Sequence, residues 1–181
     1  MANRPSNRAR NDWTLSLLEL SPDARVLEIG FGPGYALSRL LTRIPEGRAI
    51  GIDHSTAMLT QARRRNAAGV AAHRLELHLG TLELLERWPD RFDAIYSANV
   101  FQFISDRPAA FRQILAALKP GGHVATTFQP RHPGATDADA LHFGRSLIAD
   151  LERAGLTAAR LEHDPRSPVL TICALAQRPG P

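Results

Sequence analysis

Short apolar runs alternate along the chain with longer segments whose apolar residues recur at helical spacing. The short runs predict seven strands, at residues 24–30, 48–53, 73–80, 92–100, 123–128, 157–163 and 168–177. The longer segments predict helices at residues 12–20, 35–44, 55–69, 108–118 and 137–155. Strands that alternate with helices are typical of an α/β fold, in which a mostly parallel sheet is connected through helices.

The last two predicted strands break this alternation. Only the short stretch "DPRSP" joins them, which leaves no room for a crossover helix. Two consecutive strands with so short a connection pair as an antiparallel hairpin. The sequence therefore predicts a parallel sheet that ends in a C-terminal hairpin.

The size and composition restrict the class of protein. A chain of 181 residues fits one domain, with residues 22–181 as the core and residues 1–21 as an N-terminal helix and candidate lid. No apolar run reaches the roughly 20 residues that span a bilayer, and the N-terminus lacks the pattern of a secretory signal. With one cysteine, Cys173, disulfides and cysteine-based zinc sites are excluded. We expect a cytoplasmic protein, and the spacing of its seven histidines predicts no metal site.

The formal net charge of +4 raises the question of nucleic-acid binding. Lys119 is the only lysine, so nearly all of the positive charge comes from arginine, in a sequence also rich in alanine. A compositional bias explains this pattern as well as a phosphate-binding face does. We therefore do not expect a nucleic-acid partner.

The stretch "EIGFGPGY" places glycines at positions 30, 32 and 34, between the first strand and the first helix of the alternating pattern. Residues without Cβ adopt unusual φ angles and let a ligand approach the backbone closely. A plain tight turn is one alternative. The dinucleotide-binding pattern G-x-G-x-x-G is another, but Tyr35 stands where its third glycine is expected.

Asp53 supports a ligand site at the glycine loop. It ends the second strand in "GID", 23 residues after Gly30, where a carboxylate can accept hydrogen bonds from both hydroxyls of a ribose. Its alternative role is to cap the helix that follows, and the two roles are compatible.

These motifs resemble those of the class I S-adenosylmethionine-dependent methyltransferases, and most closely the small-molecule branch typified by ubiquinone- and menaquinone-biosynthesis enzymes. The resemblance covers residues 22–130 in motif detail. It is carried by "VLEIGFGPG", "GIDHSTAML", "RFDAIYSANVFQFISD" and "ILAALKPGGHVAT", in this order. It implies a Rossmann-like sheet of order 3-2-1-4-5-7-6, with the last strand antiparallel and helices on both faces, and S-adenosylmethionine as methyl donor, with S-adenosylhomocysteine as product.

The resemblance also implies which residues bind this cofactor. The glycine loop and its acidic residue would lie by the amino-acid moiety, Asp53 by the ribose, and the start of the next helix by the adenine. The residues so implied are Glu28, Gly30, Gly32, Gly34, Asp53, His54, Met58 and Ser97. After the third strand, Gly80 is followed by Thr81 where relatives usually carry aspartate, so adenine contact would pass through the Thr81 hydroxyl or the backbone of Leu82.

A catalytic base is not needed when the acceptor is already nucleophilic, because alignment and desolvation supply much of the acceleration. The sequence offers only weak catalytic candidates. Gln102 stands where many relatives carry histidine, and it cannot act as a base at neutral pH. Tyr35 begins a helix beside the donor, and His132 lies on a loop at the ligand-binding edge of the sheet; packing and surface exposure are their alternative roles.

The sequence thus predicts a methyltransferase that transfers a methyl group to a small-molecule acceptor by in-line displacement. Methylation of RNA or protein, and binding of S-adenosylmethionine without catalysis, remain as alternatives. The short N-terminal segment leaves open whether the helix at residues 12–20, a homodimer partner or the acceptor itself closes the site.

Overall fold

A computed structural model describes residues 5–164, 166 and 168–180 of the chain. The strands are β1 (Arg25–Ile29), β2 (Arg48–Asp53), β3 (Leu75–Leu79), β4 (Phe92–Ala98), β5 (Leu118–Phe128), β6 (Thr157–Asp164) and β7 (Thr171–Gln177). The helices are α1 (Pro5–Ser16), α2 (Tyr35–Arg43), α3 (Thr56–Arg65), α4 (Ala67–Ala71), α5 (Arg107–Ala117) and α6 (Asp137–Arg153), together with the 3-10 helices η1 (Leu82–Arg87) and η2 (Phe101–Phe103).

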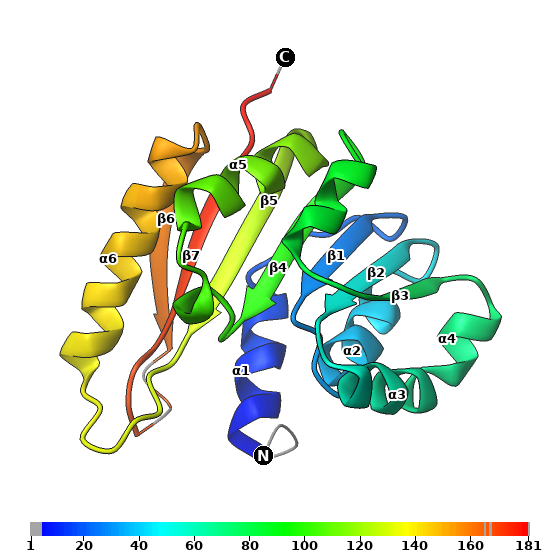
Figure 1. The fold of residues 1–181 in the computed structure, drawn as a ribbon, viewed down its shortest axis with the longest axis horizontal. Helices are drawn as coiled ribbons and strands as arrows, with labels where there is room; N and C mark the ends of the chain where they lie inside the picture. The colour runs from blue at the N-terminus through cyan, green and yellow to red at the C-terminus, as the bar shows by residue number, and fades with distance from the viewer. Residues whose placement is uncertain (1–4, 165, 167, 181) are drawn as a thin grey trace.

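All seven strands form one sheet in the order β3-β2-β1-β4-β5-β7-β6. The first five strands are parallel, and β7 lies between β5 and β6, antiparallel to both. The α/β class, the strand order and the C-terminal hairpin are therefore confirmed. In Figure 1 the arrows of β4 and β5 point toward the lower edge of the sheet, where the N-terminal end of α1 also lies.

Two apolar clusters fill the faces of the sheet. One joins the sheet to η1, α5 and α6, and the other joins it to α1, α2 and α3. Successive residues of β1 alternate between them: Leu27 and Ile29 belong to the first cluster, and Val26 to the second. Because apolar clusters cover both faces of the sheet, the sequences of the central strands are nearly continuous apolar runs.

Several element boundaries differ from the prediction. The first helix begins at Pro5 and ends at Ser16, seven and four residues before the ends expected for residues 12–20. The helix expected at residues 55–69 is divided at Asn66, whose side-chain amide donates to the carbonyls of Gly34 and Ala62 (both 3.0 Å). Strand β5 begins at Leu118, five residues before the start expected at residue 123, so the "KPGG" stretch belongs to it, and the change of register between Phe92 and Ala94 accommodates this stretch. Ser55 caps α3, and its hydroxyl accepts a hydrogen bond from the N–H of Met58 (3.3 Å).

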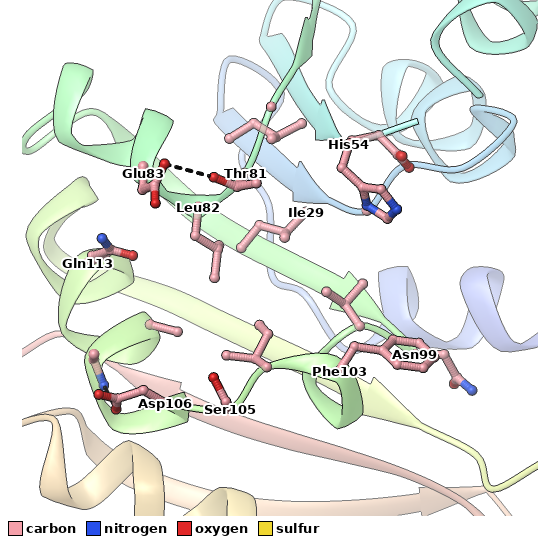
Figure 2. Close-up of a pocket in the computed structure, with 18 of the residues that line it drawn as sticks. Ile29, His54, Thr81, Leu82, Glu83, Asn99, Phe103, Ser105, Asp106 and Gln113 are labelled. Atoms are coloured by element: carbon pink, nitrogen blue, oxygen red, sulfur yellow. Dashed lines mark hydrogen bonds between the residues drawn. The ribbon is translucent and has the colours of Figure 1, made fainter. Parts of the chain in front are cut away.

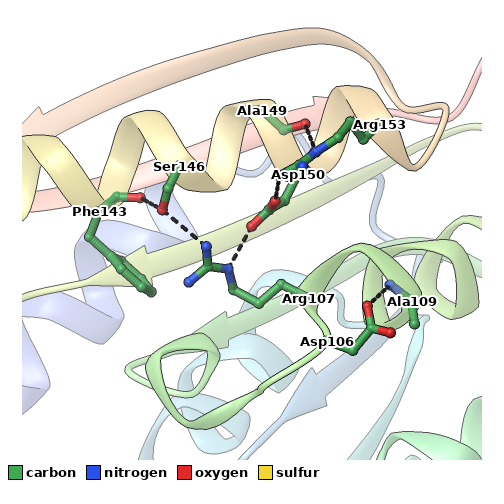
Figure 3. Close-up of polar contacts among 8 residues, drawn as sticks. All are labelled: Asp106, Arg107, Ala109, Phe143, Ser146, Ala149, Asp150 and Arg153. Carbon is green, nitrogen blue, oxygen red and sulfur yellow. Dashed lines mark hydrogen bonds and ion pairs between the residues drawn. The ribbon is translucent and has the colours of Figure 1, made fainter.

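Helices α5 and α6 are tied together by a buried carboxylate (Figure 3). Asp150 of α6 is 1% exposed and accepts a hydrogen bond from Nε of Arg107 in α5 (2.6 Å). Its second oxygen accepts from Arg153, one turn further along α6. The guanidinium of Arg107 also lies over the Phe143 ring, 5.1 Å from its centroid. These contacts fix the start of α5, which follows the loop at the end of β4.

We expect Asp150→Ala to lower the free energy of unfolding by about 3 kcal/mol, because the half-buried Arg107 loses its counter-charge. Urea unfolding measures the loss. The matched change Arg153→Ala removes a side chain that is 66% exposed and is expected to cost less than about 1 kcal/mol. Equal losses in the two variants would contradict this assignment of the buried pair.

Candidate functional site

A cavity of about 960 Å³ opens at the carboxyl ends of β1 to β4 (Figure 2). Open α/β sheets bind their ligands at this edge. Apolar side chains, Leu82 among them, point into the cavity, and Phe103 at its border is 81% exposed. Of the predicted cofactor residues, the cavity is lined by Gly30, Asp53, His54, Gly80, Thr81 and Leu82.

All three glycines of the loop after β1 have positive φ angles, and the space that a Cβ would enter differs between Gly30 and Gly32. Gly30, at φ 72°, donates to the carbonyl of Ile52 (2.7 Å), and a Cβ there would stand 2.5 Å from a methyl group of Val100. Gly32, at φ 52°, would carry its Cβ into open space with nothing within 4 Å. Gly30 is thus required by packing within the chain, whereas the space in front of Gly32 is free for a ligand to approach the backbone.

Asp53 connects the glycine loop to the second strand. The N–H of Gly32 donates to Oδ2 of Asp53 (2.8 Å), and the N–H of Ser55 donates to Oδ1 (2.9 Å). Each carboxylate oxygen can accept a second hydrogen bond. Asp53 lines the cavity, is 7% exposed and keeps lone pairs for a ligand. It does not cap α3 itself, because Ser55 is the capping residue and Asp53 only bonds to the N–H of Ser55.

The end of β3 brings a second carboxylate to the cavity. The hydroxyl of Thr81 donates to Oε2 of Glu83 (3.2 Å), as the dashed line in Figure 2 shows. Glu83 lines the cavity but was not among the predicted residues. No motif in the sequence marks Glu83. Its position two residues after Thr81 is the only feature that points to it.

The end of β4 turns sharply at Asn99, which lines the cavity and has a φ of 55°. Asparagine tolerates this left-handed conformation better than most residues. Its side chain pairs twice with the backbone of Gln129 at the end of β5: Nδ2 donates to the carbonyl (2.9 Å), and Oδ1 accepts from the N–H (3.1 Å). The cavity wall is thereby joined to the loop that follows β5.

Glu28 lies inside the protein, on the α1 side of the sheet. It is 3% exposed, and its carboxyl accepts a hydrogen bond from the Tyr96 hydroxyl (2.9 Å). The pKa of Glu28 is raised to about 8, chiefly by burial; the Tyr96 hydrogen bond acts to lower the pKa, and the nearby Asp53 carboxylate adds to the rise. The acidic residue of the first motif is therefore mostly protonated at neutral pH in the ligand-free protein.

The other predicted cofactor residues do not line the cavity. Gly34 precedes α2, where a Cβ would collide with Asn66 and Ala62 of the neighbouring helix. Met58 packs against the cluster on the α1 side of the sheet, and the buried hydroxyl of Ser97 bonds to that of Thr126 (2.8 Å).

None of the three catalytic candidates lines the cavity either. The Tyr35 hydroxyl donates to Asp12 of α1 (2.8 Å), which ties α1 to α2. The Gln102 amide donates to the Asn99 carbonyl (3.0 Å). His132 is exposed on the loop after β5. Their catalytic roles stay predictions.

Within the described part of the chain, no group of three or more histidine, cysteine, aspartate or glutamate side chains could hold a metal ion. None of the helices that the structure describes is long and apolar enough to cross a membrane.

The fold is Rossmann-like, and its cavity opens beside the glycine loop that follows β1. Residues 26–122 match the methyltransferase domain family. The chain is 35% identical over 174 residues to the uncharacterized methyltransferase YdaC of Bacillus subtilis (strain 168), covering 96% of this chain and 94% of that protein. It belongs to this family, that of the class I S-adenosylmethionine-dependent methyltransferases.

Two further relatives extend this comparison. Trans-aconitate 2-methyltransferase of Deinococcus radiodurans is 29% identical over 162 residues, which are 90% of this chain and only 58% of the length of that enzyme. The crystal structure of a SAM-dependent methyltransferase from Aquifex aeolicus superimposes with a TM-score of 0.80 at 18% identity, covering 97% of this chain and 94% of that one. The latter similarity confirms the fold.

Proposed function

We propose that this single domain transfers a methyl group from S-adenosylmethionine to a small-molecule acceptor in the cytoplasm. The observation that carries the proposal is the cavity of about 960 Å³ lined by Gly30 and Asp53, whose size matches that of sites that enclose small ligands. The similarity to trans-aconitate 2-methyltransferase, an enzyme named for a small-molecule substrate, supports this class of acceptor.

The residues of the cavity fit the donor. The unused lone pairs of Asp53 suit the two ribose hydroxyls, and the open space in front of Gly32 suits the amino-acid moiety. At the other side, the Glu83 carboxylate, which accepts a hydrogen bond from the Thr81 hydroxyl, offers an acceptor for the adenine amino group. Thr81 itself stands where relatives usually carry aspartate. Leu82 and Ile52 supply apolar contacts to the base.

When bound, S-adenosylmethionine supplies a methyl group on a sulfonium, so that the new bond to the acceptor forms as the C–S bond breaks and its electron pair stays on sulfur. The chain contributes alignment and exclusion of water. Asp53 fixes the adenosine end, and the apolar side chains of Val100 and Phe103 flank the reaction space. An acceptor that reacts through a neutral O–H group also releases one proton to solvent, whereas an acceptor anion releases none.

Calorimetric titration of the purified protein with S-adenosylhomocysteine tests this proposal, with NADH as the control. We expect S-adenosylhomocysteine to bind in a one-to-one ratio with a micromolar dissociation constant, and NADH to give no saturable heat. If the folded protein did not bind S-adenosylhomocysteine, the proposed use of the cavity would be refuted. Binding without methylation of any small molecule in an acceptor screen would favour the non-catalytic alternative.

A further inference from the structure

Phe103 is an aromatic side chain that the fold leaves in contact with solvent at the border of the cavity. It is 81% exposed and lines the cavity. In the described part of the chain, the only other large apolar side chain that is exposed is Leu79, at 49%, and Leu79 does not line the cavity. A large apolar side chain stabilises a contact when it leaves water. Its exposure beside a cavity therefore indicates a contact that forms when a ligand binds.

The fold holds Phe103 in this exposed position. Helix η2 is anchored by Phe101, which is buried and stacks on Phe111 of α5, with ring centroids 4.4 Å apart. The N–H of Phe103 donates to the carbonyl of Val100 (3.0 Å), which closes the turn. Because a 3-10 helix has about three residues per turn, positions 101 and 103 point to different sides of it. The burial of Phe101 therefore directs Phe103 away from the core.

The cavity wall around Phe103 carries no charge. Its neighbours in the sequence that also line the cavity are Asn99, Val100, Ile104 and Ser105. The side-chain amide of Asn99 is already bonded through both its nitrogen and its oxygen to the backbone of Gln129. None of the described residues that line the cavity is a lysine or an arginine. An anionic group placed beside Phe103 would therefore lose its water without gaining a counter-charge.

The carboxylates of the cavity are engaged away from Phe103. Glu83 and Asp106 lie at the other end of the cavity (Figure 2). Asp106 caps α5, where its Oδ1 accepts from the N–H of Ala109 (2.9 Å). Asp53 holds two backbone N–H groups and is the residue proposed to bind the ribose. A cationic acceptor beside Phe103 would likewise lack a counter-charge.

The placement proposed for the donor leaves Phe103 to the acceptor. Asp53 and His54 belong to the side of the cavity that is assigned to the donor, and Phe103 lies across the cavity from His54 (Figure 2). An aromatic ring is the ligand group that suits an exposed aromatic side chain best, because offset or edge-to-face ring pairs attract each other beyond the effect of the area they bury.

We propose that the methyl acceptor carries an uncharged, planar aromatic ring and that this ring packs against the side chain of Phe103. The inference rests on the proposed function and adds the chemical class of the acceptor. It assigns Phe103 the role of a specificity-determining residue that selects a flat, uncharged ring over a charged or a saturated compound of similar size.

The probe for this site is 2-naphthol, titrated by calorimetry into the complex of the protein with S-adenosylhomocysteine. Its phenolic hydroxyl keeps its proton at neutral pH, so the planar ring system enters without charge, and we expect saturable binding. Decahydro-2-naphthol has the same hydroxyl on a saturated frame, whereas 2-naphthoate and 2-naphthylmethylammonium carry the same rings with a charge of either sign. Each of these three compounds should bind at least about tenfold more weakly than 2-naphthol.

Phe103→Ala should weaken the binding of 2-naphthol about tenfold, because the ring pair and its buried area are lost. Phe103→Trp restores an aromatic ring and should retain the binding. Leu79→Ala is the matched control, because it removes the other exposed large apolar side chain and leaves the lining of the cavity intact. Both positions are exposed, so we expect all three variants to fold, and circular dichroism checks this.

The proposal would be overturned if the wild-type complex showed no saturable binding of 2-naphthol, if it bound a charged or the saturated probe as tightly, or if Phe103→Ala left the affinity for 2-naphthol unchanged. An equal loss of affinity for S-adenosylmethionine or S-adenosylhomocysteine in Phe103→Ala would also overturn it, because the ring would then cover the donor. A wild-type dimer that Phe103→Ala dissociates in sedimentation would mean that a second copy covers the ring instead. Failure of the wild type to bind S-adenosylhomocysteine would refute the proposed function itself.

Discussion

Asp53→Ala is expected to weaken the binding of S-adenosylhomocysteine by at least about a hundredfold. In the proposed site the variant would lose two charge-assisted hydrogen bonds to the ribose, each worth roughly 1.5–3 kcal/mol. It also frees the N–H of Gly32, which Asp53 holds at 2.8 Å, so the glycine loop loses its anchor. Calorimetric titration of the purified variant measures the effect, after circular dichroism has confirmed that it folds.

Asp93→Ala is the matched control for this experiment. The Asp93 carboxylate likewise accepts from a backbone N–H, that of Arg25 (2.7 Å), and from Lys119 (2.7 Å), but it lies at the amino ends of β1 and β4. Its loss should leave the affinity for S-adenosylhomocysteine unchanged. If the two alanine variants bound equally well, Asp53 would serve only to hold the backbone of Gly32 and Ser55.

The second large effect concerns the pH dependence of stability. The pKa of Glu28 is about 8 in the folded protein, against 4.5 for an unperturbed glutamate. Between these values the folded state holds a proton that the unfolded chain has released, so rising pH lowers the stability of the wild type by about 1.4 kcal/mol per pH unit through this group. This loss of stability is absent below about pH 4.5 and complete above about pH 8.

Glu28→Gln removes this titration and keeps an oxygen that accepts the Tyr96 hydrogen bond. Relative to the wild type, the variant should therefore gain about 3 kcal/mol in free energy of unfolding between pH 5 and pH 7, measured with urea at each pH. Glu46→Gln, at an exposed position, is the control and should show no such gain. A constant difference between Glu28→Gln and wild type across this range would contradict a protonated Glu28.

The sequence predicted well those features that depend on residues close together in the chain. Residues 48–53 form a strand with the predicted boundaries because a charged residue and an aspartate flank a continuous apolar run. The hairpin of β6 and β7 follows from the shortness of its connection. The glycine loop and Asp53 come together because the carboxyl ends of adjacent parallel strands share one edge of the sheet.

The features that the sequence did not predict depend on contacts between residues that are far apart in the chain. Asn66 divides a helical pattern by bonding to Gly34, 32 residues away, and no local signal marks such a partner. Arg10 and Gln129 are 119 residues apart, and their pairing requires α1 to lie over β5. Tyr35 begins a helix at the site edge, yet its hydroxyl turns toward Asp12.

The position of β7 between β5 and β6 has a consequence for synthesis on the ribosome. While residues up to 164 have emerged, β6 has no neighbour in the sheet and the outer edge of β5 offers unpaired N–H and C=O groups. Both gaps close only when residues 171–177 arrive, so β6 and β7 join the sheet in one late step. Until that step, the nascent chain presents an open edge of the kind at which other chains add strands and aggregate.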